Sequence, residues 1–210
     1  MAAPPIGLWV VLLVVGALGL WELRALRTGG PSLALGALFL SGLVCLGALR
    51  ELGPSYARHG IAAGLPVWLL LAVLPTWAGD VVAYLVGSTM GRRRLAPALS
   101  PGKTWEGTIA GFAASAVAVL AVAAAFGLPR VPAGIAALAL GPVGLAGDLL
   151  ESYVKRRAGV KDSGTLLPGH GGVLDRLDSL VAAAVFVLLL IVAWSVSSAL
   201  GGEGGMFERF

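Results

Sequence analysis

The sequence has little charge and almost no cysteine or histidine. Only 12% of its 210 residues are charged, well below the roughly 25% that is typical of soluble domains. The single cysteine, Cys45, excludes an intrachain disulfide, and with only two histidines there is no cluster of zinc ligands. With a hydrophobic content of 58% and a mean hydropathy of +0.90, the chain is not expected to adopt a water-soluble fold.

The few charges are mostly basic, with a formal net charge of +4 and an isoelectric point near 9.7. In a soluble protein this excess would suggest a nucleic-acid partner. In membrane proteins, however, basic residues gather in cytoplasmic loops and near anionic lipid head groups. We therefore expect the lipid bilayer as a partner, and no nucleic acid.

Long apolar runs fill most of the chain, and a transmembrane helix needs about 20 mostly apolar residues. The run 61–90 is too long for one simple span, and Pro75 and Asp80 interrupt it, so one broken helix and two short segments both fit. The sequence predicts six or seven spans, within the ranges 5–23, 32–49, 61–90, 108–128, 131–150 and 173–200.

Two polar segments, 91–106 and 151–172, are rich in lysine and arginine. The positive-inside rule assigns both to the cytoplasmic side. Two predicted spans separate them, so the chain crosses the membrane and returns to the same face. Upstream the orientation stays open, because basic residues flank both ends of the second span, at positions 24, 27, 50 and 58.

Charge is concentrated late in the chain, since ten of the 26 charged residues lie between Asp148 and Asp178. Asp148 ends an apolar span, where an unpaired carboxylate is costly and ionisable residues are typically functional. If that helix continues beyond the span, polar residues at three- and four-residue spacing share one face, which is expected to point into a polar cavity. These residues are Asp148, Glu151, Ser152 and Lys155.

Asp175 and Asp178 are also three residues apart, at the start of the last apolar run. Both carboxylates can face one point near a helix N-terminus, or they can serve as a helix cap and an ion-pair partner of Arg176. Together with Asp148 they offer the hard oxygen ligands preferred by Mg²⁺, which also binds substrate phosphates. The expected metal ligands are therefore Asp148, Asp175 and Asp178.

Basic and glycine-rich segments lie between these acidic groups. Lysine and arginine neutralise phosphate oxygens, and glycine lets backbone N–H groups approach them. Metal ligands interleaved with phosphate-binding groups indicate phosphoryl or nucleotidyl transfer, although the run 155–161 alone would also fit an anchor loop. The expected participants are Lys155, Arg156, Lys161, His170, Gly171, Gly172 and Arg176. His170 fits phosphate orientation and an interfacial position equally well.

The other polar segment precedes the span at 108–128. Four of its residues are placed to hold phosphate at a helix start or to cap that helix: Ser100, Lys103, Thr104 and Glu106. An ordinary interfacial turn anchored by Trp105 fits the same residues. Upstream, the buried acid Asp80 fits either a structural pairing within Arg92–Arg94 or a catalytic role.

The stretch from Ser152 to Asp178 resembles the signature of the phosphatidate cytidylyltransferases, also called CDP-diacylglycerol synthases. The likeness rests on Ser152-Tyr153-Val154-Lys155-Arg156, Lys161-Asp162-Ser163-Gly164 and Pro168-Gly169-His170-Gly171-Gly172-Val173-Leu174-Asp175-Arg176-Leu177-Asp178. Such fixed spacing over about 30 residues is more specific than a short motif. Segments around Asp80, Ser100–Gly107 and Gly147–Ser152 are similar too, whereas Val81 and Gly102 depart from the family pattern.

Composition and resemblance together predict an all-α, polytopic transmembrane bundle of about six to eight spans, with the active site at the cytoplasmic membrane interface. We expect N-terminal transmembrane helices in residues 1–76, a catalytic transmembrane domain in residues 77–200 and a tail in residues 201–210. The resemblance further implies a homodimer in a bacterial-type inner membrane.

By the same resemblance, CTP and phosphatidic acid react to give CDP-diacylglycerol and pyrophosphate. The implied cofactor is Mg²⁺, with room for a second cation such as K⁺. Two other CTP-dependent lipid enzymes stay open, a polyprenol kinase and a cytidylyltransferase of the CDP-archaeol synthase type. Outside the enzymes, a transporter would use ionisable residues as a permeation path.

Overall fold

The chain is represented by a computed structural model, which describes residues 6–26, 28–56, 65–164, 166 and 171–200. The predicted tail, 201–210, lies outside these residues. The described residues form the helices α1 (Ile6–Ala25), α2 (Gly30–Tyr56), α3 (Val67–Met90), α4 (Trp105–Phe126), α5 (Arg130–Arg157) and α6 (Leu174–Leu200). Between α3 and α4 lies a hairpin of β1 (Arg94–Ala96) and β2 (Ser100–Thr104).

All six helices are long and apolar enough to cross a membrane, which confirms the polytopic bundle. The ambiguous run 61–90 contributes one span, α3, with Pro75 inside the helix. A proline removes one backbone N–H donor, and transmembrane helices tolerate this where neighbouring helices pack around them. The described chain therefore has six spans rather than seven.

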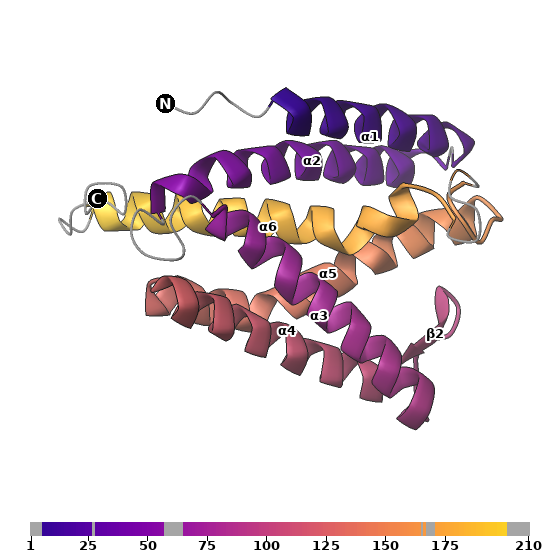
Figure 1. Cartoon of the computed structure of the whole chain (residues 1–210). Helices are drawn as coiled ribbons and strands as arrows, with labels where there is room; N and C mark the ends of the chain where they lie inside the picture. Colours follow the sequence, from indigo (N-terminus) through magenta and orange to yellow (C-terminus); the bar gives the residue numbers. More distant parts are fainter. Residues whose placement is uncertain (1–5, 27, 57–64, 165, 167–170, 201–210) are drawn as a thin grey trace.

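Helix α6 lies at the centre of the bundle, where it contacts α2, α3 and α5. Helix α1 packs on the outer side of α2, and α4 packs against α3 and α5. Figure 1 shows the α3–α4 pair diverging from α1 and α2 toward the end that carries the hairpin. The predicted domain boundary between residues 76 and 77 lies inside α3, and that division stays a prediction.

Glycines let α3 and α4 approach closely. A Cβ atom on Gly107 would lie 2.5 Å from the Ala83 carbonyl oxygen, and one on Gly111 would lie 2.8 Å from the Gly79 carbonyl oxygen. Such contacts are possible only without side chains, as in the small-residue interfaces of membrane helices. The crossing of these two helices therefore depends on glycine.

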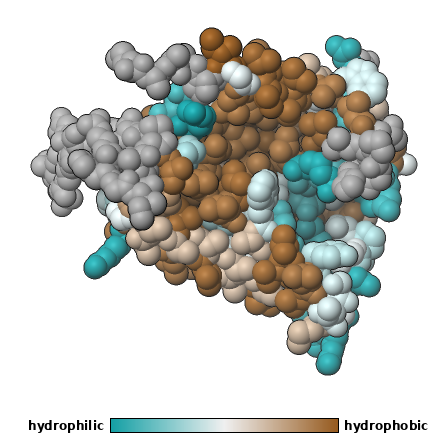
Figure 2. Space-filling model, viewed as in Figure 1, coloured by the Kyte–Doolittle hydropathy of each residue, from teal (hydrophilic) through white to brown (hydrophobic). Residues whose placement is uncertain are grey.

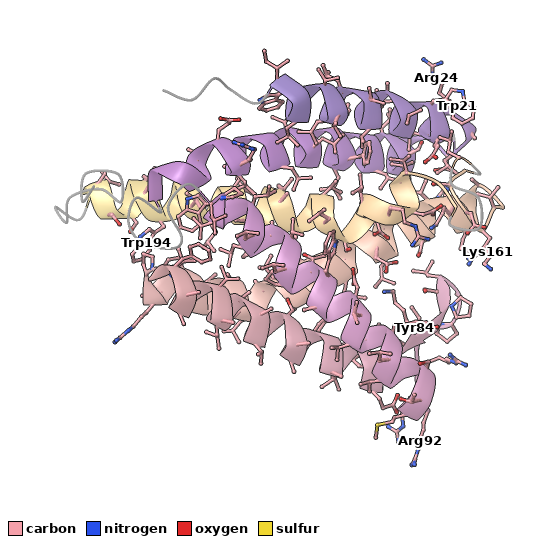
Figure 3. The ribbon with its side chains drawn as sticks, in the orientation of Figure 1. Trp21, Arg24, Tyr84, Arg92, Lys161 and Trp194 are labelled. Atoms are coloured by element: carbon pink, nitrogen blue, oxygen red, sulfur yellow. The ribbon has the colours of Figure 1, made fainter. Side chains whose placement is uncertain are left out.

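Most of the charged groups gather at one end of the bundle, although Arg50, Glu51 and Arg130 lie toward the other. Figure 3 shows Arg24, Arg92 and Lys161 at the end near the hairpin and Trp194 at the opposite end, and in Figure 2 the hydrophilic colours gather near the hairpin end of a mostly hydrophobic surface. Because α3 is a single span, Arg24 at the end of α1 shares this end with the hairpin. The relative orientation of the N-terminal spans, left open by the sequence, is thereby fixed.

The hairpin is a feature that the all-α prediction lacks. Its antiparallel strands pair Arg94 with Thr104 and Ala96 with Ser100. The Trp105 N–H donates to the Arg93 carbonyl oxygen at 2.9 Å and so closes the hairpin onto the start of α4. Proline and glycine within β2 are poor strand formers, which explains why local propensity does not reveal this element.

We predict that Gly107→Ala destabilises the α3–α4 contact. The added methyl group must displace the Ala83 carbonyl, and overpacking of this kind typically costs about 1–3 kcal/mol. The matched control is Gly134→Ala in α5, where no atom lies within 4 Å of the new Cβ. Thermal unfolding in detergent should show a lower melting temperature for Gly107→Ala alone, and equal melting of the two variants would contradict the packing role.

Candidate active site

Helix α5 carries the predicted polar face beyond its apolar span. The helix continues to Arg157, and the Ser152 hydroxyl donates to Asp148 Oδ1 at 3.3 Å. One turn further, Lys155 Nζ lies 3.3 Å from Glu151 Oε1. These two contacts at four-residue spacing confirm that Asp148, Glu151, Ser152 and Lys155 share one face.

Lys155 joins this face to the start of α6. Its Nζ lies 2.5 Å from Asp175 Oδ1, and the Lys155 side chain is only 13% exposed. Glu151 is 0% exposed and interacts electrostatically with both Asp175 and Asp178. Lys155 therefore stands between two carboxylates that are withdrawn from water, a situation that costs free energy unless the charges are balanced.

Asp175 is held rigidly by its other oxygen. Asp175 Oδ2 accepts hydrogen bonds from Ser163 N at 3.0 Å, Ser163 Oγ at 3.0 Å and Gly172 N at 2.8 Å. Gly171 has a φ of +78°, and a Cβ atom there would lie 2.6 Å from Asp175 Oδ2. The Gly172 N–H, predicted to meet phosphate, thus serves Asp175 in this structure.

A second group of carboxylates lies between α3, α5 and α6. Lys103 Nζ, on β2, lies 2.5 Å from Asp148 Oδ2. Asp80 accepts a hydrogen bond from Ser179 Oγ at 3.1 Å rather than pairing with one of the arginines that follow α3. Asp178 interacts electrostatically with Asp148 and Asp80. The structure therefore brings the predicted acids of three helices together.

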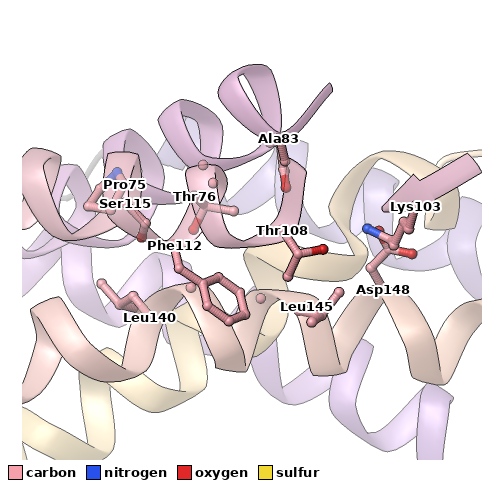
Figure 4. Close-up of a pocket in the computed structure, with 15 residues that line it drawn as sticks. Pro75, Thr76, Ala83, Lys103, Thr108, Phe112, Ser115, Leu140, Leu145 and Asp148 are labelled. Carbon is pink, nitrogen blue, oxygen red and sulfur yellow. The ribbon is translucent and has the colours of Figure 1, made fainter. Parts of the chain in front are cut away.

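Two adjoining cavities open on these groups. The larger, of about 620 Å³, lies between α3, the hairpin and the start of α4, and its lining includes Asp80, Arg94, Ser100, Lys103, Thr104 and Asp148. The smaller, of about 50 Å³, reaches deeper between α3, α4 and α5. Figure 4 shows Lys103 and Asp148 at one end of the smaller cavity and Ser115 and Leu140 at the other. Asp80, Lys103 and Asp148 line both cavities.

Other predicted residues hold the backbone around the cavities. Thr104 caps α4 by accepting a hydrogen bond from Gly107 N at 3.2 Å. The Glu106 carboxylate, in the first turn of α4, accepts hydrogen bonds from Arg92 N at 3.1 Å and Arg93 N at 3.3 Å. It thereby fixes the turn between α3 and β1.

The remaining predicted residues lie at the edge of the site or are not among the residues that the structure describes. Arg156 Nε donates to the Leu99 carbonyl oxygen at 3.1 Å and so ties the hairpin turn to α5. Lys161 is exposed at the end of the bundle (Figure 3). Arg176 lies in the first turn of α6. His170 lies outside the described residues. The phosphate-binding roles of these residues stay predictions.

Glu22, a buried carboxylate on α1, is not among the residues predicted from the sequence. Glu22 is 1% exposed, and it accepts hydrogen bonds from Ser163, Val173 and Leu174 in the segment that leads into α6. The available signal was an acid inside the first apolar span, the same signal that identified Asp80 and Asp148.

The fold and site define a multi-pass membrane protein that collects acidic and basic side chains beside a cavity at one end of its bundle. Residues 55–194 match the model of the cytidylyltransferase family. The chain belongs to this family and is an enzyme of the nucleotidyltransferase class.

Several bacterial proteins named phosphatidate cytidylyltransferase are similar to it. The protein of Brucella abortus is 41% identical, and the alignment covers 86% of this chain and 71% of that protein. The protein of Haemophilus influenzae is 43% identical over 61% of this chain and 45% of its own length. The protein of Pseudomonas aeruginosa is 42% identical over 63% of this chain and 49% of its own length.

Activity of this family implies a divalent cation. Five carboxylates, those of Asp80, Asp148, Glu151, Asp175 and Asp178, are linked through neighbouring pairs at the site, and among the described residues Lys103 and Lys155 form ion pairs with three of them. Carboxylate oxygens that outnumber the neighbouring lysines are a donor set that fits a hard divalent cation. In the described part of the chain, no three His, Cys, Asp or Glu side chains already form a metal-type cluster. The ligand set of Asp148, Asp175 and Asp178 therefore stays a prediction.

We predict that Lys155→Met strongly destabilises the protein. Removing one partner of a buried ion pair typically costs about 3–5 kcal/mol, because the remaining charges are left uncompensated. The double variant Glu151→Gln, Lys155→Met should recover part of the loss, and exposed Lys161→Met serves as the control. Thermal unfolding in detergent tests this, and additive effects of Glu151→Gln and Lys155→Met would contradict the pairing.

Proposed function

We propose that this chain transfers the cytidylyl group of CTP to phosphatidic acid, giving CDP-diacylglycerol and pyrophosphate for phospholipid synthesis. The observation that carries the proposal is the family match together with a cavity of about 620 Å³ that joins Lys103 and Asp148 at the end of the membrane bundle. The similar bacterial proteins carry the name of this activity. A cavity at the end of a membrane bundle is accessible both to a lipid phosphate from the bilayer surface and to a nucleotide from water.

In the proposed reaction, a phosphate oxygen of phosphatidic acid attacks the α-phosphorus of CTP. A new P–O bond forms there, the bond from the α-phosphorus to the oxygen that bridges to the β-phosphorus breaks, and its electron pair leaves on pyrophosphate. A phosphomonoester has a second pKa of about 6. The lipid phosphate is largely dianionic at neutral pH, so the chain does not have to supply a general base.

The chain's own contribution is positioning and charge neutralisation. Lys103, on the hairpin, is placed to hold a phosphate of either substrate, with Ser100 and Thr104 beside it at the cavity. Arg94 adds a second positive charge to the same lining. We assign Mg²⁺ to Asp148, Asp175 and Asp178, with room for a second cation such as K⁺, and bound Mg²⁺ would neutralise nucleotide oxygens.

We further propose that the site faces the cytoplasm of a bacterial cell and that the membrane is the inner membrane. Support comes from the positive-inside rule, because Arg24, the arginines after α3 and the basic end of α5 all lie at the end with the hairpin. A catalytic unit in residues 77–200 and a homodimer are proposals that rest on the family resemblance.

The alternatives predict different observations. A transporter would spread ionisable groups across the bilayer midplane, whereas here the paired acids and lysines gather at one end of the bundle. A CTP-dependent polyprenol kinase would release CDP. An ether-lipid cytidylyltransferase would prefer an archaeal-type lipid phosphate over phosphatidic acid.

The direct test is purified protein with CTP labelled in the α-phosphate, phosphatidic acid and Mg²⁺. We expect label in a CMP-bearing lipid and one pyrophosphate released for each lipid formed. Formation of CDP, or product only with ether-lipid phosphates, would overturn the assignment. Omission of Mg²⁺ should abolish product.

Asp175→Asn keeps the side chain's shape but removes one charge. We predict that activity falls by about two orders of magnitude or more, as for the loss of one electrostatic stabiliser. The control is Glu51→Gln on α2, which also removes one carboxylate but lies at the other end of the bundle. Near-normal turnover of folded Asp175→Asn protein would refute its role.

Cysteine labelling tests the orientation of the site. Arg92 follows α3 at the hairpin end and Arg130 begins α5 at the other end, and both are exposed. In intact spheroplasts, a membrane-impermeant maleimide should label Arg130→Cys but not Arg92→Cys, which should react only after permeabilisation. Native Cys45 is buried and adds little background. The opposite pattern would place the site outside the cytoplasm.

A further inference from the structure

Glu22 is a carboxylate buried in the mostly apolar helix α1, and the hydrogen bonds that it accepts from described residues come from Ser163, Val173 and Leu174. Its Oε1 accepts a hydrogen bond from Val173 N at 2.9 Å. Its Oε2 accepts from Leu174 N at 3.0 Å and from Ser163 Oγ at 3.1 Å. A buried carboxylate is costly unless donors satisfy it. Three donors from residues about 150 positions away in sequence do so here.

The described residues next to the Glu22 carboxylate leave room for it and favour its negative charge. Val173 and Leu174 stand at the start of α6, where backbone N–H groups have no partner within the helix and a negative charge is favoured. A Cβ atom on Gly164 would lie 2.7 Å from Glu22 Oε1, and one on Gly172 would lie 2.5 Å from Oε2. Glycine at both positions leaves the space that the Glu22 carboxylate fills.

Ser163 connects Glu22 to the candidate active site. Its hydroxyl lies 3.1 Å from Glu22 Oε2 and 3.0 Å from Asp175 Oδ2, and its backbone N–H also donates to Asp175. Because the hydroxyl has one hydrogen, it serves one carboxylate at a time and stays held between the two. Asp175 in turn is paired with Lys155. A continuous set of contacts therefore runs from α1 to α5.

From these contacts we propose that Glu22 is a positioning residue for the transfer reaction. It fixes the segment that carries Ser163 and the start of α6, and so sets where Asp175 and Asp178 stand. Glu22 lines neither of the two cavities, so it acts through these residues rather than on substrate. It also lies outside residues 55–194, which the family model matches. The activity part of this proposal rests on the proposed function.

Glu22→Gln tests the proposal with little change in shape. The amide nitrogen is a donor and cannot accept, so at least one hydrogen bond from Val173 N or from the Leu174 and Ser163 pair is lost. We expect kcat to fall about tenfold to a hundredfold, as for other residues that orient a metal ligand. The Mg²⁺ concentration for half-maximal activity should rise by about tenfold for the same reason. The matched control, Glu51→Gln, should change neither value.

A readout without substrate separates this proposal from the proposed function. In Glu22→Gln protein, hydrogen–deuterium exchange should accelerate at the amides of Ser163, Val173 and Leu174, while amides in α3 and α4 keep their protection. If the wild-type protein makes no CMP-bearing lipid, the proposed function fails, yet the exchange comparison still tests the Glu22 contacts. Ser163→Ala, which keeps the two backbone bonds of Glu22, should accelerate exchange less and serves if Glu22→Gln does not fold.

Two results would overturn the proposal. One is unchanged exchange at these amides, or unchanged kcat and Mg²⁺ dependence in a folded Glu22→Gln protein. The other is faster exchange throughout the bundle, with activity reduced only in proportion to the amount of folded protein. The second result would assign Glu22 to general stability rather than to the placement of Asp175.

Discussion

The ion pairs of Lys155 with Glu151 and Asp175 are the interaction on which the rest of the site depends. Helices α5 and α6 meet through an ammonium group that is mostly shielded from water, and Glu151 is fully buried beside it. Coulomb attraction is strong in such surroundings, but so is the penalty for an unpaired charge. The ends of α5 and α6 are therefore restricted to arrangements that keep the Lys155 ammonium group beside the carboxylates of Glu151 and Asp175.

Helix packing delivers the acids to this point. A Cβ atom on Gly147 would lie 2.5 Å from the Asp178 carbonyl oxygen, so α5 and α6 approach closely one residue before Asp148. Small residues permit such an approach between membrane helices. On the other side, the glycine contact between α3 and α4 sets the position of Asp80 and of the hairpin that carries Lys103. The close packing of these helices thus determines where the charged side chains of the site lie.

Local sequence patterns predict the spans and the polar face of α5, because both follow from composition and helical periodicity. They do not predict the hairpin, since proline and glycine in β2 disfavour a strand and only the pairing with β1 stabilises it. Ser179 as the partner of Asp80 and Glu22 as the anchor of the α6 segment depend on helix packing across long sequence distances. Periodicity within one helix contains no information about these contacts.

The two lysines of the site differ in a way that bears on their roles. Lys155 is 13% exposed and stands between two helices, whereas the Lys103 side chain is 26% exposed and extends from a short hairpin into the larger cavity. Asp175 has three further hydrogen-bond donors besides Lys155, whereas among the residues that the structure describes Asp148 accepts from Ser152 alone besides Lys103. Under the proposed function, a substrate phosphate that attracts Lys103 leaves Asp148 as the carboxylate most free to bind a cation. Under that proposal, the pair with Asp175 keeps one cation ligand in a fixed position, and the looser pair with Asp148 lets a second ligand respond to substrate.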